Sequence, residues 1–395
     1  MSRIIFISDS PLLTTGYAVA AKNLGKQFRR MGHDVAFVAF THAGSPSYIK
    51  LDTEECPIYE GGLSFSIEKA FEDWKPDLGI HIRDAFAHSP RHHANPYSLV
   101  ALQHRPRLIL YSPVQSDMLP EEFIAACTQQ ADLTICFTKW GSNVLLFQGV
   151  PFNRLETVLC GFDEEIYKPM QVNKAEYGFS KKPVIGSIGI ADQYRKGWPL
   201  LLEAMSIAKK GYKTLDGTKI EGEPELEAYL GTSPEGHYDL AHHIKQFHLS
   251  GSVAFPARYS KTWGMSDQKQ AALYNCFSAY ATSTISEGFN LPLLEAFACG
   301  IPTIATDLPN HREVLKDIGF FVKARKDYPT AWSLEWLVDT QEMAGCILKA
   351  LKMDAAQRDE LKRAQIERAK ELTWKKQAEE WIRVIKKHEE LGVRF

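Results

Sequence analysis

Short apolar runs alternate with amphipathic helical patterns along this 395-residue chain, and this alternation constrains its fold more than any other feature. A run such as IIFI, residues 4–7, is apolar at every position, which is typical of a strand covered by helices on both faces. The amphipathic stretches between such runs indicate crossover helices that join parallel strands. The pattern therefore predicts an α/β protein built on parallel sheets.

The pattern occurs twice, on either side of a polar, lysine-rich passage over residues 169–183. In the first half we expect strands at residues 3–8, 34–40, 78–82, 108–111, 133–137 and 155–159, and helices at 16–31 and 139–148. In the second half we expect strands at residues 184–188, 227–230, 253–255, 279–281, 303–305 and 320–322. Two Rossmann-like halves with a hinge near residues 165–183 are the simplest account of this order.

These halves set the expected domains. The first domain is predicted over residues 1–168 and the second over residues 183–372. In the remaining stretch, 373–395, apolar residues such as Trp374 and Trp381 share one helical face. We therefore expect a final helix over residues 373–391 that packs back across the domain junction.

Composition excludes several classes of protein. Hydrophobic residues make up 45% of the chain and charged residues 24%, as in ordinary globular proteins. No apolar stretch approaches the roughly 20 residues of a membrane span. The formal net charge of -2 gives no global basic field, so it does not favour nucleic acid as a partner. The seven cysteines form no C-x-x-C pair, which is typical of free thiols in a reducing compartment and predicts a cytoplasmic protein.

Two loops that follow predicted strands carry anion-binding features. Ligands of open α/β sheets bind beyond the carboxyl ends of the strands, so these loops are where a site is expected. After the first strand, Gly16 begins a helix whose N–H groups attract anions. After the first strand of the second half, Arg195 and Lys196 precede Gly197 and a helix. Positive charges at a helix start oppose the helix dipole unless an anion lies between them and the helix, so we expect a phosphate to bind beside Arg195 and Lys196. For each of the two loops, the alternative to an anion site is an ordinary turn.

A third loop, SEGFNLPLLEAFACG at residues 286–300, places Glu295 alone in an apolar helical run. A glutamate is rarely buried without a partner. Asn290 is expected to cap this helix, with Pro292 in its first turn. Free N–H groups at the helix start can bind a diphosphate, and a carboxylate further along can accept two hydrogen bonds from a ribose. We predict that Glu295 holds a ribose and that Glu287 reaches a transferred group; a salt-bridged rim glutamate is the alternative for Glu295.

The segment ISEGFNLPLLEAFACGIPTIATDLPNHREVL, residues 285–315, closely resembles the signature of retaining glycosyltransferase family 4, which belongs to the group 1 glycosyl transferases. Three more segments follow the family's order, so the resemblance covers most of the chain: TTGYAVAAKNLGKQFRRMGHDV, FTKWGSNVLLFQGVPFNRLETVLCGFDEEIYKP and RKGWPLLLEAM. It implies the GT-B architecture, with two Rossmann-like domains facing each other across a cleft. It also implies transfer of a hexosyl or pentosyl group from a UDP- or GDP-linked sugar to an acceptor hydroxyl, with retention at the anomeric carbon.

The resemblance implies a role for each matching position. Glu295 would bind the ribose of the donor, and Glu287 would contact the donor sugar. Lys196 would neutralise the diphosphate, with Arg195 beside it. The backbone N–H groups at the start of the helix would face the sugar and the phosphates: Phe289, Asn290 and Leu291. Gly16 would approach the same phosphates from the first domain.

Two positions depart from the family's pattern. Ser187 stands where many members have an arginine, and Arg195 can replace that arginine. Many members also have a histidine after the fourth strand of the first domain, where this chain reads YSPV, with Pro113. No cofactor is implied beyond the donor. The chain has no D-x-D motif, and Lys196, Arg195 and helix dipoles can stabilise the leaving diphosphate, so catalysis is expected to be metal-independent.

The acceptor is expected to bind the first domain, and its class stays open between a sugar, a lipid, a small metabolite and modified nucleic acid. Residues 88–107 concentrate arginines and histidines, which would suit an anionic acceptor such as DNA, with a solvated loop as the alternative. The helix at 16–31, with Lys22, Lys26, Arg29 and Arg30, is the segment for peripheral membrane contact, with a core-packed helix as the alternative.

Two other functions remain alternatives to the transferase. One is a catalytically silent GT-B protein that binds a sugar or nucleic acid. The other is a different GT-B chemistry, such as a sugar-nucleotide epimerase.

Overall fold

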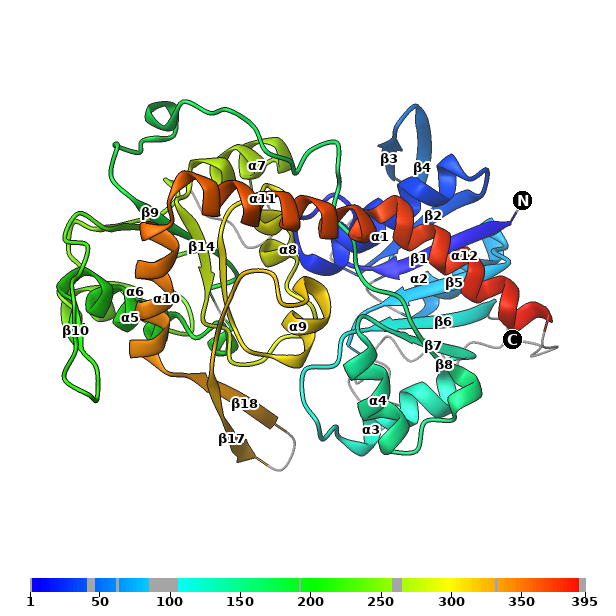
Figure 1. Cartoon of the computed structure of the whole chain (residues 1–395). Coiled ribbons are helices and arrows are strands. Elements are labelled where there is room, and N and C mark those ends of the chain that lie inside the picture. Colours follow the sequence, from blue (N-terminus) through cyan, green and yellow to red (C-terminus); the bar gives the residue numbers. More distant parts are fainter. Residues whose placement is uncertain are drawn as a thin grey trace. The chain divides into compact units, whose positions relative to one another are not determined.

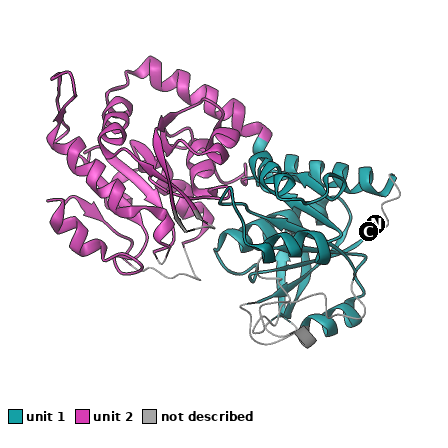
Figure 2. Ribbon diagram, turned by 90° about the horizontal axis from the view of Figure 1, so that it is seen from below, with its two compact units in different colours: residues 1–161, 331–333, 372–395 teal, residues 162–330, 334–371 magenta. Residues whose placement is uncertain are grey.

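The structure is a computed structural model that describes residues 2–40, 47–61, 64–84, 106–191, 193–257, 265–330 and 333–390 (Figure 1). By their contacts the residues form two compact units (Figure 2). Unit 1 comprises residues 1–161, 331–333 and 372–395, and unit 2 comprises residues 162–330 and 334–371. Each unit is a sheet covered by helices, so the predicted α/β class is confirmed.

Unit 1 is built on an eight-stranded sheet in the order β3-β4-β2-β1-β5-β6-β7-β8. Its strands are β1 Arg3–Ser8, β2 Asp34–Ala39, β3 Ser47–Leu51, β4 Glu54–Glu60, β5 Leu78–Ile82, β6 Arg107–Ser112, β7 Leu133–Cys136 and β8 Leu155–Thr157. Neighbours are parallel except β3 and β4. The sequence predicts all but that antiparallel hairpin. It misses the hairpin because residues such as those of SYIKL alternate between partly buried and exposed and form no apolar run.

The helices of unit 1 include α1 Gly16–Arg30, α2 Ser64–Trp74, α3 Glu121–Ala125, which continues as the π-helix η3 Ala126–Gln130, α4 Lys139–Phe147, the 3-10 turn η4 Phe152–Arg154 and α12 Trp374–Glu390. Thr15 caps α1, its hydroxyl accepting a hydrogen bond from the N–H of Ala18. The two arginines of α1 are paired: Arg29 lies 2.6 Å from Asp34 and Arg30 lies 2.7 Å from Asp52. Helix α1 also buries Ala18, Leu24 and Phe28, as expected for the core-packed helix that was the alternative to membrane contact.

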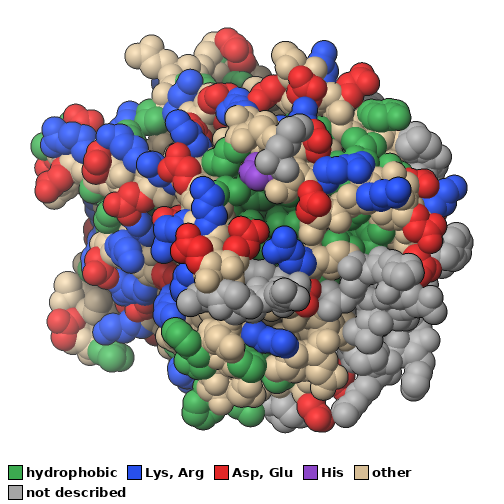
Figure 3. Space-filling view, turned by 90° about the vertical axis from the view of Figure 1, so that its right-hand side faces the viewer, with side chains coloured by type: hydrophobic (Ala, Val, Ile, Leu, Met, Phe, Trp, Pro, Cys, Tyr) green, Lys and Arg blue, Asp and Glu red, His purple; other side chains and the backbone are tan. Residues whose placement is uncertain are grey.

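Charge is also mixed elsewhere on the surface. On the face drawn in Figure 3, acidic and basic side chains of the described residues are interspersed. Among the described helices, none is both long and apolar enough to span a bilayer.

Helix α12 completes the core of unit 1. Trp381 is fully buried and packs edge-on against Tyr111 of β6, with ring centroids 5.0 Å apart. Its ring also lies 6.3 Å from that of Phe28 on α1. The chain approaches so closely at Gly161 that a Cβ atom there would lie 2.6 Å from the backbone nitrogen of Trp374. The predicted C-terminal helix therefore exists, and it packs on unit 1.

Unit 2 is built on a six-stranded parallel sheet in the order β13-β12-β9-β14-β15-β16. Its strands are β9 Val184–Ile188, β12 Glu227–Gly231, β13 Val253–Ala254, β14 Ala279–Thr282, β15 Thr303–Thr306 and β16 Phe320–Val322. The sequence predicts all six. Its helices are α5 Trp198–Lys210, α6 Leu240–Gln246, α7 Asp267–Cys276, α8 Leu291–Ala298, α9 Pro309–Leu315, α10 Thr340–Lys352 and α11 Ala355–Ala369, with 3-10 turns η5 Lys174–Tyr177, η6 Tyr194–Lys196 and η7 Lys370–Leu372.

Two small hairpins of unit 2 lie outside the sequence prediction. They are β10 Tyr212–Lys213 with β11 Lys219–Ile220, and β17 Ala324–Thr330 with β18 Ser333–Val338. The second hairpin follows β16 directly and is tied back to the sheet, because the N–H of Trp336 donates to the carbonyl of Ile285 at 2.8 Å.

Candidate functional site

The strand order of unit 2 marks one position for a ligand. From β9 the chain proceeds outward through β12 and β13, and then returns to β14 on the other side of β9 and continues through β15 and β16. The order therefore reverses between β9 and β14, and ligands of open α/β sheets bind at the carboxyl ends of the strands at such a switch point. The loops that follow β9 and β14 carry Arg195, Lys196 and Glu287.

These three side chains form one buried ionic cluster. Glu287 Oε1 lies 2.6 Å from Arg195 Nη1, and Glu287 Oε2 lies 2.6 Å from Lys196 Nζ. The side chain of Glu287 is 7% exposed, that of Lys196 13% and that of Arg195 19%. Arg195 also donates to the carbonyl of Ser286 at 3.1 Å, which fixes the guanidinium against the second loop.

The cluster carries two positive charges and one negative charge. Burial by itself would raise the pKa of Glu287, but the charges and hydrogen bonds of Arg195 and Lys196 outweigh it and lower this pKa to about 2. Burial and the adjacent Arg195 lower the pKa of Lys196 to about 8, although Glu287 opposes this. The carboxylate of Glu287 is therefore ionised at neutral pH, and burial, with a smaller effect of Arg195, makes Lys196 easier to deprotonate.

A glycine allows the two loops to meet. Gly197 has φ of +62°, and a Cβ atom there would lie 2.3 Å from the carbonyl oxygen of Ser283. The hydroxyl of Ser283 donates to the carbonyl of Gly197 at 2.8 Å. The hydroxyl of Thr284 donates to the carbonyl of Arg195 at 2.9 Å. The basic loop is thus bound to the end of β14 along its backbone.

The start of α8 offers backbone donors beside this cluster. Asn290 occupies the N-cap position with Pro292 in the first turn, as predicted. Its conformation is left-handed, with φ of 78°, and its side chain does not cap the helix, which corrects the expected mode of capping. Within the described ranges, no residue accepts a hydrogen bond from the backbone N–H of Phe289, Asn290 or Leu291. These groups can therefore donate to an anion or to sugar hydroxyls.

Two residues of α9, Asn310 and His311, form hydrogen bonds with the loop that follows β14. Asn310 Nδ2 donates to the carbonyl oxygen of Glu287. Asn290 Nδ2 lies 3.3 Å from His311 Nε2, and His311 Nδ1 lies 2.8 Å from the carbonyl oxygen of Thr306. Burial lowers the pKa of His311, so its ring is neutral. Neither Asn310 nor His311 was predicted from the sequence. The signal that points to them is their position after β15, at the same edge of the sheet.

Glu295 lies inside unit 2 on α8 and is 5% exposed. Its Oε2 accepts hydrogen bonds from Gln270 Nε2 at 2.7 Å and from the hydroxyl of Tyr274 at 2.8 Å. Burial raises its pKa to about 7, although hydrogen bonds from these groups and from Tyr167 oppose the rise. Gln270 and Tyr274 are neutral donors on α7, and no cation of the described residues pairs with Glu295, so the described part of the chain does not support the alternative of a salt-bridged rim residue.

The other predicted positions are more dispersed. Gly16 begins α1 in unit 1, next to Thr15, whose hydroxyl donates to Asp9 Oδ2 at 2.6 Å. Ser187 is buried in β9 and Pro113 directly follows β6. Of the basic segment 88–107, residues 88–105 lie outside the described residues. Arg107 Nη1 lies 3.5 Å from Glu389 Oε1.

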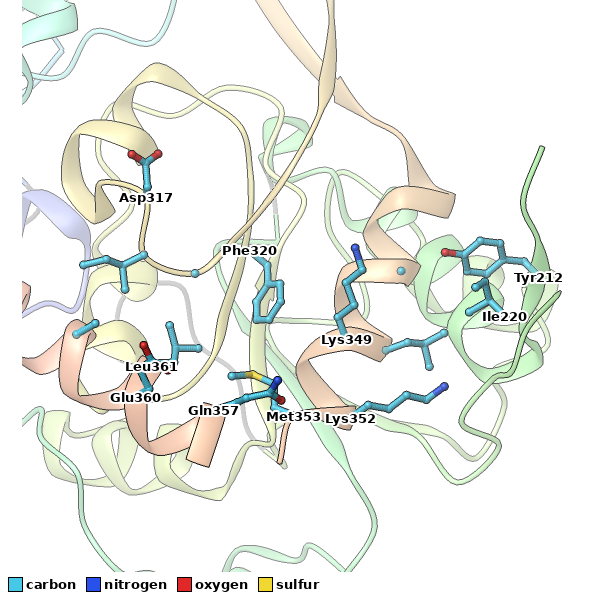
Figure 4. A pocket seen from close by; sticks show the side chains of 15 residues that line it. Tyr212, Ile220, Asp317, Phe320, Lys349, Lys352, Met353, Gln357, Glu360 and Leu361 are labelled. Atoms are coloured by element: carbon cyan, nitrogen blue, oxygen red, sulfur yellow. The ribbon is translucent and has the colours of Figure 1, made fainter. Parts of the chain in front are cut away.

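A separate pocket of about 790 Å³ lies at the opposite edge of the sheet of unit 2 (Figure 4). Its lining includes Phe320 at the amino end of β16, Tyr212 of β10, Lys349 of α10 and Leu361 of α11. None of the predicted site residues lines it. The described residues contain no group of three or more histidine, cysteine or acidic side chains arranged to hold a metal ion.

Comparison with known proteins identifies the class that this fold and these loops define. Residues 170–352 match the family model of glycosyl transferases group 1. This match confirms the family resemblance of the sequence signature, because the signature and the basic loop both fall within the matched residues. No curated protein matches the sequence.

Solved structures confirm the GT-B fold over the whole chain. Sucrose-phosphate synthase from Thermosynechococcus elongatus is 16% identical with a TM-score of 0.75, covering 98% of this chain and 99% of that chain. HepE of Anabaena in complex with UDP-glucose is 16% identical with a TM-score of 0.70, covering 98% and 100%. Trehalose-6-phosphate synthase OtsA is 13% identical with a TM-score of 0.68, covering 98% and 99%. At these identities the likeness establishes the fold alone.

Proposed function

We propose that this protein is a retaining glycosyltransferase that moves a hexosyl or pentosyl group from a UDP-sugar to an acceptor hydroxyl. The observation that carries the proposal is the buried cluster of Arg195, Lys196 and Glu287 with its surplus positive charge. It lies in the same loop system as the N–H groups at the start of α8, which bond to none of the residues that the structure describes. Both features suit a diphosphate, whose negative charge would be shared between side chains and backbone donors.

The electrostatics favour an anion of more than one charge. Two cations held beside a single carboxylate in a desolvated place are less stable than the same cations with a second anion. Burial is the main reason that the pKa of Lys196 is lowered to about 8, and the adjacent Arg195 adds to it. A bound diphosphate would raise that pKa again, so nucleotide binding and protonation of Lys196 are coupled.

The donor is proposed to be a UDP-sugar for two reasons. Structures with the same fold contain UDP-glucose or UDP-2-fluoro glucose. Glu295 lies on α8, the helix whose N-terminus would face the diphosphate, and its carboxylate can accept hydrogen bonds from both hydroxyls of a ribose. In this arrangement Glu287 lies on the sugar side of the diphosphate and Glu295 lies on the nucleoside side.

The proposed reaction places charge where the cluster can stabilise it. As the bond between the anomeric carbon and the diphosphate breaks, negative charge grows on the leaving oxygen. Lys196 and Arg195 would stabilise that charge, and Glu287 would face the positive charge that grows on the sugar ring. Retention would result if the acceptor hydroxyl attacks from the face that the diphosphate leaves and passes its proton to the leaving diphosphate oxygen. Unit 1 is proposed to bind the acceptor, and Gly16 at the start of α1 is proposed to approach the phosphates of the donor.

Thermal unfolding with nucleotides tests this proposal. UDP, GDP, ADP and NAD are added at saturating concentration to the wild type, to Glu295→Ala and to Glu360→Ala, an exposed carboxylate of α11 that serves as the control. A ligand at about 100 times its Kd stabilises the folded protein by about 2.7 kcal/mol. We expect UDP to stabilise the wild type and the control but not Glu295→Ala. Stabilisation by none of the nucleotides would refute the donor site and favour a silent binding protein.

A further inference from the structure

The loop after β14 contains an unfavourable backbone conformation. Asn290 has φ of 78° and ψ of 71°, in the left-handed region that residues other than glycine rarely occupy. Asparagine enters this region more readily than most residues, but its side chain normally satisfies local backbone groups when it does so. Here the side chain makes no capping bond to α8. Another partner must therefore hold it.

That partner is the imidazole of His311. A carbonyl oxygen can only accept, so the 2.8 Å contact between His311 Nδ1 and the oxygen of Thr306 places the ring proton on Nδ1. The unprotonated Nε2 is then an acceptor, and Asn290 Nδ2 donates to it at 3.3 Å. His311 is fully buried on α9, and the adjacent Asn310 donates to the carbonyl oxygen of Glu287. Helix α9 thus forms a hydrogen bond to each end of the turn from Glu287 to Asn290.

We propose that His311 is a positioning residue for the donor site. Its neutral ring holds Asn290 in the left-handed conformation, and in this conformation the N–H groups of Phe289, Asn290 and Leu291 bond to no described residue. The inference rests on the proposed function, in which those N–H groups bind the donor. His311 itself does not touch the donor; it acts through Asn290.

Substitutions at both residues test the proposal. His311→Leu removes the acceptor, whereas His311→Gln keeps one acceptor and one donor in the side chain. Asn290→Gly removes the side chain but adopts the left-handed conformation without steric cost, and Asn290→Ala removes the side chain and disfavours that conformation. UDP affinity and the KM and kcat of donor turnover are measured for each, together with the double variant His311→Leu/Asn290→Gly.

The expected results follow from the conformation. His311→Leu and Asn290→Ala weaken UDP binding and lower kcat/KM by about 10- to 100-fold, since a buried donor is orphaned or the turn is strained. His311→Gln retains activity within about threefold. Asn290→Gly loses less activity than Asn290→Ala, and the double variant matches Asn290→Gly, because glycine no longer needs the imidazole. If the fold-loss of the double variant equals the fold-loss of His311→Leu multiplied by that of Asn290→Gly, the two residues act independently and the proposal is overturned. Equal losses in Asn290→Gly and Asn290→Ala would also overturn it, and this comparison leaves the buried imidazole intact.

A measurement without nucleotide separates this inference from the proposed function. Urea unfolding of the wild type, Asn290→Ala, His311→Leu and the corresponding double variant gives the coupling between the two side chains. Coupling together with UDP binding by the wild type supports the proposal. If the wild type binds UDP but the side chains are uncoupled, the positioning role of His311 is wrong while the proposed function stands. If they are coupled but the wild type binds no nucleoside diphosphate, the proposed function fails and the positioning role fails with it.

Discussion

Replacing Glu295 by glutamine is expected to stabilise the free protein while weakening its affinity for nucleotide. Burial raises the pKa of this carboxyl from 4.5 to about 7. The folded state therefore holds the proton more tightly than the unfolded state, and each increase in pH between 4.5 and about 7 lowers the free energy of unfolding. At about 1.4 kcal/mol per pKa unit, the full penalty above pH 8 is on the order of 3 kcal/mol. Glutamine removes this penalty and can still accept hydrogen bonds from Gln270 and Tyr274.

The assay is urea unfolding of the wild type and Glu295→Gln at pH 5 and pH 8.5, compared transition by transition because the chain forms two units. The variant's advantage should grow by about 2.5 kcal/mol between the two pH values. Its UDP affinity at pH 8.5 should fall at least tenfold, because a neutral amide replaces the charged acceptor of the ribose hydroxyls. A variant that is less stable than the wild type at pH 8.5 would refute the reasoning.

Glu287→Gln is the matched control, because the same chemical change should act with the opposite sign. The cationic neighbours outweigh burial and lower the pKa of Glu287 to about 2, so its ionisation contributes stability above pH 4.5 that is lost as the pH falls toward 2. Glutamine also leaves Arg195 and Lys196 buried without their anion. Glu287→Gln is therefore expected to destabilise the protein at pH 8.5, where Glu295→Gln stabilises it.

Three further results are expected. Glu287→Ala should abolish transfer while UDP binding remains largely intact, whereas Glu295→Ala should weaken binding itself; equal losses of binding, measured by calorimetry, would contradict these roles. UDP affinity should be highest between about pH 7 and pH 8, because protonation of Glu295 below this window and loss of the proton from Lys196 above it both remove a binding charge; a flat pH profile would contradict this. Gly197→Ala should lower UDP affinity at least tenfold, since its Cβ would lie 2.3 Å from the oxygen of Ser283; an unchanged Kd would show that the contact is relieved at little cost.

The sequence predicts the sheets well because their strands are continuous apolar runs. The run from Val184 to Ile188 is found at the expected residues, as is the strand at the end of the second half, Phe320–Val322. The β17–β18 hairpin was missed because ARKDYPT has no period-two apolar pattern. It is held by contacts that depend on the fold, such as the hydrogen bond between Trp336 and Ile285.

Site residues were predictable as positions but not as partners. Loops after parallel strands lead to the same edge of the sheet, so Lys196 and Glu287 could be assigned to one region before the structure was known. The pairing of Glu287 with Arg195 and Lys196 could not be predicted from the sequence, because it depends on β14 lying beside β9. For the same reason the sequence does not reveal that His311, which follows β15, reaches Asn290.

The return of the chain to unit 1 has a consequence for synthesis on the ribosome. Residues 1–161 are made first, but the indole of Trp381 that covers Tyr111 and Phe28 emerges roughly 200 residues later. At about 5–20 residues per second, this delay is about 10 to 40 s. During that time unit 2 receives every residue it needs, whereas unit 1 keeps an aromatic surface exposed. Unit 1 is therefore expected to be the last to finish folding. The chain is expected to be most prone to aggregation during synthesis, before Trp381 emerges and covers Tyr111 and Phe28.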